Sequence, residues 1–230
     1  MEETAVKRVR LFAHPTIARP LRSLRNSIAS YGLACGLVTL TILAWPEPAR
    51  SNWRLVGPST GRIVQIRYDP PDAAVVYTGT EYGVFKSTDG GASWFSSNRG
   101  APYAYVTALA VDPLDTQQIW MALSSGSICL GVFHSTDGGS HWEAASNGLD
   151  PCIDDLAVIP LTAGTVFAAT AHGVFRTVDA GLIWEVVGLV DQRVGAVTFN
   201  AAAPETLYAG ADSDGPYRST DGGATWDRAA

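Results

Sequence analysis

Four side chains of this sequence could do chemistry together: Arg62, Tyr105, Asp154 and Arg193. Two guanidinium groups can hold an anion through charge-assisted hydrogen bonds, and a tyrosine and a carboxylate add polar contacts that suit a sugar. Glycoside hydrolysis needs two carboxylates at a set separation, and the nearest partner of Asp154 is Asp155. Adjacent residues of a strand point to opposite faces, so these two cannot form that pair. The four residues therefore predict a binding mouth for an anion or a sugar, and we assign no catalytic residue.

The alternative is that these side chains are solvated loop charges. Their common feature is position, because Arg62, Tyr105, Cys152 and Arg193 precede equivalent strands of a repeated unit and Asp154 lies just inside one of those strands. The repeat must therefore be defined before the residues can be placed.

One turn motif, S/T-x-D-x-G-x-x-W, occurs four times, with its aspartates 48, 42 and 42 residues apart. In a tight turn the Asp side chain accepts backbone N–H bonds, glycine supplies positive φ, and Ser or Thr adds a second local bond. The Trp returns on the next strand and buries its ring between units. The motif residues are Ser87, Asp89, Gly91, Trp94; Ser135, Asp137, Gly139, Trp142; Thr177, Asp179, Gly181, Trp184; Ser219, Asp221, Gly223 and Trp226. The third copy has Ala180 where the others have glycine, so we expect its turn to be the least ideal.

Each motif ends a longer pattern of short apolar strands. A Gly-x-aromatic strand precedes it, an earlier strand contains Tyr77, Trp120, Phe167 or Tyr208, and the first strands cover 63–68, 106–111, 153–158 and 194–199. Four strands per unit, repeated about an axis, make a β-propeller. We therefore expect an all-β propeller of about four blades over residues 53–230.

The sequence Gly-Val-Phe-Lys/Arg-Ser-Thr-Asp-Gly-Gly-x-x-Trp resembles the Asp-box, or BNR, repeat. That repeat is found in sialidases, sortilin-type receptors, xyloglucan-degrading glycosidases and photosystem II assembly factors, and the likeness covers 53–230. It is most similar to bacterial relatives of the photosystem assembly factors and of sortilin. In these families the box is structural and lies away from the ligand face, so the resemblance implies a fold and leaves function open.

The number of blades departs from that resemblance, since known members usually have six or more. The segment Trp53-Arg-Leu-Val-Gly57 matches the last strand of a blade, although no motif precedes it. It could pair with the last blade, so that the two ends of the chain close a ring. Three arrangements fit: a small closed propeller, a half-propeller that pairs with a second copy, and an open arc left by truncation. An open edge is tolerated only if something covers it.

The amino-terminal part predicts export. Residues 1–27 are basic, residues 28–45 carry no charge and are apolar enough for a signal sequence or a membrane anchor, and 46–52 form a linker. Both a cleaved signal and a retained anchor fit, and either places 53–230 outside the cytoplasm.

Two cysteines lie in this exported part. Cys129 sits in an insertion of the second unit and Cys152 in the next connection, on the same face, so a disulfide between them is reasonable in an oxidising compartment. Two separate buried thiols are the alternative. We find no spacing typical of a metal site and expect no metal and no cofactor. The net charge of −6 argues against nucleic acid as a partner.

These features predict a non-catalytic, extracytoplasmic scaffold or assembly module that binds a protein or a glycan. The membrane through residues 28–45 and a second copy of the chain through open blade edges are further partners. The alternatives are a carbohydrate-active hydrolase of the sialidase or glycosidase kind and a truncated propeller fragment with no function of its own.

Overall fold

The computed structural model describes residues 57–58, 61–160 and 162–229. The basic tail, the apolar run 28–45, the linker and the predicted strand at Trp53 lie outside them. Within the described residues, no helix has the length and hydrophobicity needed to cross a membrane.

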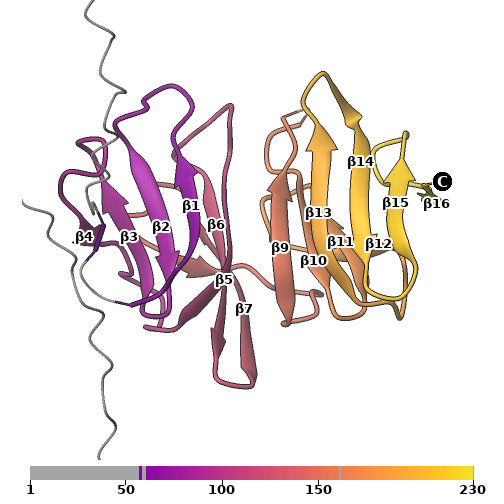
Figure 1. Cartoon of the computed structure of the whole chain (residues 1–230), viewed down its shortest axis with the longest axis horizontal. Helices are drawn as coiled ribbons and strands as arrows, with labels where there is room; N and C mark the ends of the chain where they lie inside the picture. The colour runs from indigo at the N-terminus through magenta and orange to yellow at the C-terminus, as the bar shows by residue number, and fades with distance from the viewer. Residues whose placement is uncertain (1–56, 59–60, 161, 230) are drawn as a thin grey trace, which may run out of the picture. The chain divides into compact units, whose positions relative to one another are not determined.

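The described chain forms four antiparallel sheets of four strands each, the blades of a propeller, in chain order (Figure 1). Blade 1 consists of β1 (Ile63–Tyr68), β2 (Val76–Thr80), β3 (Gly83–Ser87) and β4 (Phe95–Ser96). Blade 2 consists of β5 (Tyr105–Val111), β6 (Ile119–Ser125), β7 (Ile128–Ser135) and β8 (Glu143–Ala144). Blade 3 consists of β9 (Ile153–Val158), β10 (Val166–Thr170), β11 (Gly173–Thr177) and β12 (Glu185–Gly188). Blade 4 consists of β13 (Val194–Asn200), β14 (Ala203–Ala211), β15 (Gly215–Ser219) and β16 (Asp227–Arg228). The all-β propeller expected from the repeat is confirmed.

The first strand of each blade is the inner strand, and its register repeats. In every blade the inner strand has a bulge near its start, directly after Ile63, Val106, Ile153 or Val194, and the next four pairs with the second strand are regular. The register therefore defines equivalent positions in the four blades. The first such position holds Ile63, Val106, Ile153 and Val194.

The hydrophobic core lies between blades. One cluster joins blades 1 and 2 around Tyr77 and Val106, a second joins blades 2 and 3 around Trp120 and Leu156, and a third joins blades 3 and 4 around Phe167. Among the described residues, no such cluster joins blade 4 to blade 1. Each blade is thus stabilised by the next one in the chain, and the series has two ends.

The turn motifs fold as local hydrogen-bond clips. In the first copy the Ser87 hydroxyl donates to Asp89 Oδ1 at 2.8 Å and accepts the Gly91 N–H, also at 2.8 Å. Asp89 Oδ1 accepts the Ser93 N–H at 2.8 Å, and the same three bonds recur in the other copies. Hydrogen bonds from the Ser93 hydroxyl, the Ser93 N–H and the Ser87 hydroxyl lower the pKa of Asp89 to about 2.

The motif tryptophans differ in what they bond. The indole N–H of Trp142 donates to Ser97 O of the preceding blade, and that of Trp184 donates to Ala145 O, both at 2.8 Å. Both rings are buried. The indole N–H groups of Trp94 and Trp226 instead donate to a carbonyl of their own motif, and both rings are half-buried. The expected burial of the motif tryptophan between blades is therefore complete for Trp142 and Trp184 and partial for Trp94 and Trp226.

Candidate functional site

A pocket of about 480 Å³ is lined by all four inner strands. Its walls come from the carboxyl-terminal halves of β1, β5, β9 and β13, together with Pro70 and Pro113 from the loops that follow β1 and β5. Most of the lining is apolar, as is usual for a ligand pocket with a few polar groups.

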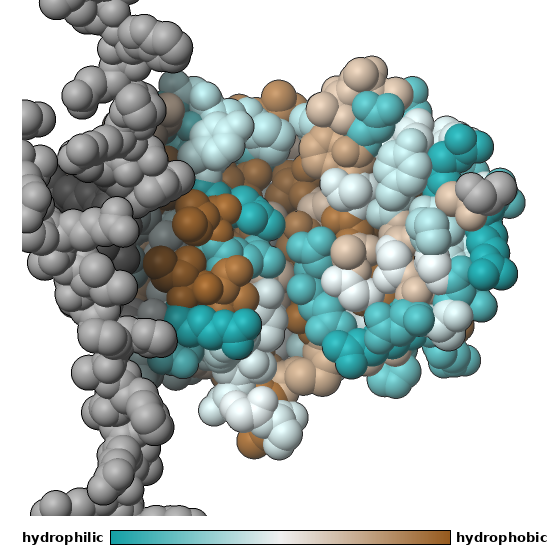
Figure 2. Space-filling model, viewed as in Figure 1, coloured by the Kyte–Doolittle hydropathy of each residue, from teal (hydrophilic) through white to brown (hydrophobic). Residues whose placement is uncertain are grey.

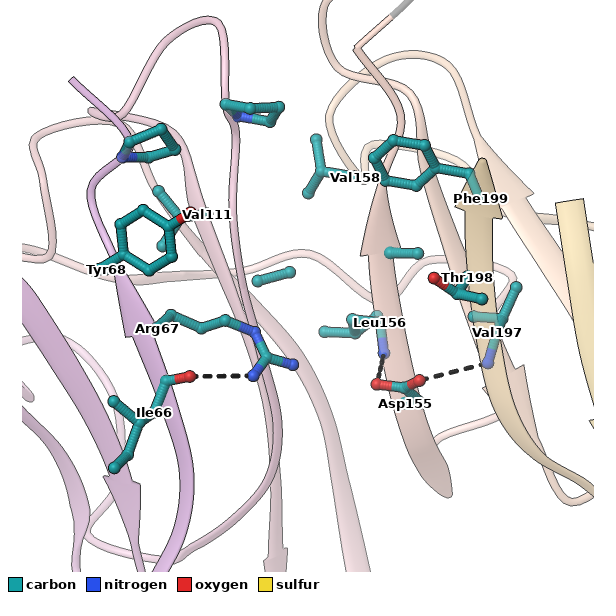
Figure 3. Close-up of a pocket in the computed structure, with 14 residues that line it drawn as sticks. Ile66, Arg67, Tyr68, Val111, Asp155, Leu156, Val158, Val197, Thr198 and Phe199 are labelled. Carbon is teal, nitrogen blue, oxygen red and sulfur yellow. Dashed lines mark hydrogen bonds between the residues drawn. The ribbon is translucent and has the colours of Figure 1, made fainter. Parts of the chain in front are cut away.

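Arg67 and Asp155 face each other across this pocket (Figure 3). The Arg67 guanidinium points from β1 toward β9, and its Nη1 donates to Ile66 O at 3.0 Å. Arg67 forms no ion pair within the described part of the chain. Its half-buried charge is therefore the cationic feature of the pocket.

The carboxylate of Asp155 is hydrogen-bonded to the backbone of the propeller. Its Oδ1 accepts the Leu156 N–H at 2.9 Å and its Oδ2 accepts the Val197 N–H at 3.2 Å, so both oxygens are used by backbone donors. Burial raises the pKa of Asp155 above its ordinary value, although the two N–H donors and the charge of Arg67 favour the ionised form. Its carboxylate positions β13 against β9.

Aromatic and aliphatic side chains surround these two groups. Tyr68 and Phe199 face the pocket from the ends of β1 and β13, and Val111 and Val158 do so from β5 and β9 (Figure 3). Tyr68 is 63% exposed. The pocket can thus offer one cation and several apolar contacts to a ligand.

The predicted mouth lies at the opposite, amino-terminal ends of the inner strands. Arg193 Nε and Nη2 donate to the two Asp154 oxygens at 3.2 Å, and Arg193 also lies 3.5 Å from Asp212. Two carboxylates therefore already compensate the charge of Arg193. Within the described residues, the side chains of Arg62 and Tyr105 form no hydrogen bond or ion pair with this group, so the mouth remains a prediction.

The sequence reasoning missed Arg67, although a signal was present. At the register position of Arg67, the other inner strands carry Ala110, Ala157 and Thr198. Arg67 is thus the one large, charged residue at a position where the other three blades pack with a small side chain. Packing does not require an arginine there, and this departure from the repeat was the signal.

The structure joins Cys129 of β7 to Cys152, the residue before β9, by a disulfide. The bond links blade 2 to the start of blade 3. Beside it, His172 Nδ1 contacts the Asp150 carboxylate, and this hydrogen bond raises the pKa of His172 above its ordinary value.

Comparison with solved structures supports the propeller fold. An ancestral GH74 enzyme is 28% identical with a TM-score of 0.61, over 77% of this chain and 25% of that one. The GH74 xyloglucanase from Xanthomonas campestris is 19% identical with a TM-score of 0.63, over 76% of this chain and 31% of that one. A structure of YCF48 bound to D1 peptide is 16% identical with a TM-score of 0.56, over 76% of this chain and 55% of that one.

The chain therefore spans a quarter to about half the length of these proteins. No family model matches it, and no curated protein matches its sequence. The likeness defines a β-propeller, while activities and ligands have to be argued from this chain's own residues.

Proposed function

We propose that the described propeller is a non-catalytic protein-interaction module, and that its central pocket binds a peptide segment carrying a carboxylate beside apolar side chains. The observation that carries this proposal is the half-buried Arg67 guanidinium in an otherwise mostly apolar pocket. A carboxylate would bond that guanidinium, and Tyr68 and Phe199 would contact the neighbouring side chains. A structure of YCF48, a propeller of similar fold, is described as bound to a D1 peptide, which supports a peptide ligand.

The test uses short apolar peptides, each made once with a free carboxyl terminus and once as the amide. We expect the purified full chain to prefer the free acids. Arg67→Gln should weaken that binding by about 10-fold or more, since hydrogen bonds to charged groups contribute about 1.5–3 kcal/mol. Loss of binding in Arg193→Gln with no effect of Arg67→Gln would move the site to the predicted mouth.

The location is part of the proposal. The apolar run 28–45 and the disulfide of Cys129 with Cys152 both favour an oxidising compartment outside the cytoplasm. The turn motifs have the hydrogen bonds expected of structural clips, which supports the proposal that they are Asp-boxes.

A carbohydrate-active hydrolase is the second candidate, favoured by the 28% identity to an ancestral GH74 enzyme. Hydrolysis by a carboxylate pair requires two acids near the sugar. The described lining of the pocket contains one, Asp155, and both of its oxygens accept backbone N–H bonds. Release of reducing ends from xyloglucan by the full chain, abolished in an Asp155→Asn variant that keeps the wild-type circular dichroism spectrum, would favour the hydrolase over the interaction module.

A further inference from the structure

The outward face of blade 1 has the apolar residues of a blade interface, and within the described residues no blade packs on it. At the first inner-strand position, Ile63 is 40% exposed, and at the third paired position Ile66 is 59% exposed. Their equivalents in blades 2 to 4 pack against the preceding blade and are at most 4% exposed: Val106, Ile153 and Val194 for Ile63, and Leu109, Leu156 and Val197 for Ile66. Hydrophobic surface is visible over β1 (Figure 2).

The outward face of blade 4 shows the complementary exposure. Tyr208 of β14 is 39% exposed, whereas its equivalents Tyr77, Trp120 and Phe167 lie under the next blade and are at most 1% exposed. A Cβ at Gly210 would meet no atom within 4 Å. At the equivalent Gly79 a Cβ would lie 3.0 Å from Cβ of Val106, in the next blade.

The contacts between consecutive blades show which groups the outward face of blade 4 could bind. The Tyr77 hydroxyl donates to Gly138 O in the turn motif of the next blade, and the indole N–H of Trp120 donates to Ala180 O, the same position one blade on. Lys86, which pairs with Tyr77, also donates to Gly138 O at 2.8 Å. Between blades 1 and 2 the second-strand aromatic and its paired cation thus both bond the first small residue of the following motif, and between blades 2 and 3 the aromatic alone does so.

Blade 4 carries the same donors as blade 1, and no described residue of another blade lies against them. Tyr208 pairs with Arg218, in the register of Tyr77 with Lys86. Together with residues of β16 they line a pocket of about 410 Å³. At the other end of the series, Gly90 occupies the place that Gly138 has in the second motif.

We propose that a second copy of the chain packs head to tail on the first, with its blade 1 seated on blade 4 and its blade 4 receiving blade 1 of the first copy. Tyr208 and Arg218 then donate to Gly90 O of the other copy, and Ile63 and Ile66 are buried against β14. A second copy is favoured over an unrelated partner because the two exposed faces are the two halves of an interface that this chain already forms three times.

Two such contacts close a ring of eight blades, which lies within the usual range of four to eight. Head-to-tail contacts give a closed ring only if the rotation between copies returns to the start, and a continuing series of copies otherwise. The inference is independent of the peptide ligand, since no residue that carries it besides Ile66 lines the central pocket.

The first test is the mass of the purified full chain in detergent, measured by light scattering with the detergent contribution subtracted. We expect twice the mass of one chain. Ile66→Glu and Tyr208→Glu each place a charge in one half of the interface and should give single chains that keep the wild-type circular dichroism spectrum. Leu114→Glu changes an apolar residue outside both faces that is more exposed than Ile66 and Tyr208, and it should leave the dimer intact.

The second test fixes the register. In a Cys35→Ser background, a chain with Gly210→Cys mixed with a chain with Ile63→Cys should form an intermolecular disulfide, because the equivalent pair Gly79 and Val106 lies at close Cβ separation. Leu114→Cys in place of Ile63→Cys should not crosslink. A single-chain mass for the wild type, a dimer unaffected by both glutamate variants, or a series of masses above the dimer would each overturn the proposal.

Discussion

The carboxylate of Asp155 in blade 3 accepts the backbone N–H of Val197 in blade 4, at 3.2 Å. Gln65, its equivalent in blade 1, does the same at the interface of blades 1 and 2, where its Oε1 accepts the Leu109 N–H at 2.9 Å. Leu109 and Val197 are themselves equivalent positions of β5 and β13. A polar side chain after the inner-strand bulge therefore joins blade 1 to blade 2 and blade 3 to blade 4, and the Asp155 carboxylate has a structural role.

Asp155→Ala should destabilise the propeller by about 1–3 kcal/mol, because it leaves the buried Val197 N–H without an acceptor. The free energy of unfolding from urea titration at neutral pH measures the effect. The matched control is its neighbour Asp154→Ala, which removes only a partly exposed ion pair with Arg193 and should cost less than about 1 kcal/mol. Equal losses for both variants would mean that the Asp155 bond adds nothing beyond surface charge.

The disulfide should contribute about 3 kcal/mol, since Cys129 and Cys152 are 23 residues apart and a crosslink of that span restricts the unfolded chain. Replacing both residues with serine should lower the melting temperature. A reducing agent should then lower the melting temperature of the wild type and leave that of the double variant unchanged. A wild-type protein insensitive to reductant would contradict a stabilising bond.

The repeat made the blades predictable because every strand, turn and motif occurs four times at nearly constant spacing. The inner-strand ranges 63–68 and 153–158 agree with the strands of the structure, since short apolar runs bounded by Gly, Pro and Asp leave few alternatives. Ala180 was predictable as the least ideal turn residue for the same reason, as a deviation from three glycines.

The site was less predictable because it depends on departures from the repeat at one end of the strands. Alignment brought Arg62, Tyr105 and Arg193 into one column, but it could not show that Arg193 lies between Asp154 and Asp212. The residues before the motifs lie over aromatic rings of their own blades, which the repeat alone did not indicate: His134 stacks on Trp120 and Lys86 lies over Tyr77.

Stability should fall in acid through the turn-motif aspartates. Hydrogen bonds from the side chain and then the backbone of Thr225 hold the pKa of Asp221 at about 2, and Asp89 has the same value. Because these folded-state values lie below the unfolded value, their contribution is complete above about pH 4 and is lost as the pH falls toward 2.

The melting temperature of Asp89→Asn/Asp221→Asn, followed across pH, checks this expectation. The double variant should melt lower than the wild type at neutral pH and should lose less on acidification between about pH 4 and pH 2. Asp227→Asn removes an exposed carboxylate outside the motifs and is the control. If the melting temperatures of the double variant and the wild type fall equally with pH, the motif aspartates are excluded as the cause of acid sensitivity.

Ala180→Gly should stabilise the protein by about 0.5–1 kcal/mol, because the backbone at Ala180 adopts φ of 61°, in the left-handed region that costs an L-residue with a Cβ. The equivalent Gly90, Gly138 and Gly222 have φ of 66–68°. Ala224→Gly, two positions later in the fourth motif and outside the left-handed region, should instead be neutral or destabilising, since glycine there only adds freedom to the unfolded chain. Urea titration of the two variants separates these signs. If Ala180→Gly destabilises as Ala224→Gly does, the third motif holds its turn without strain.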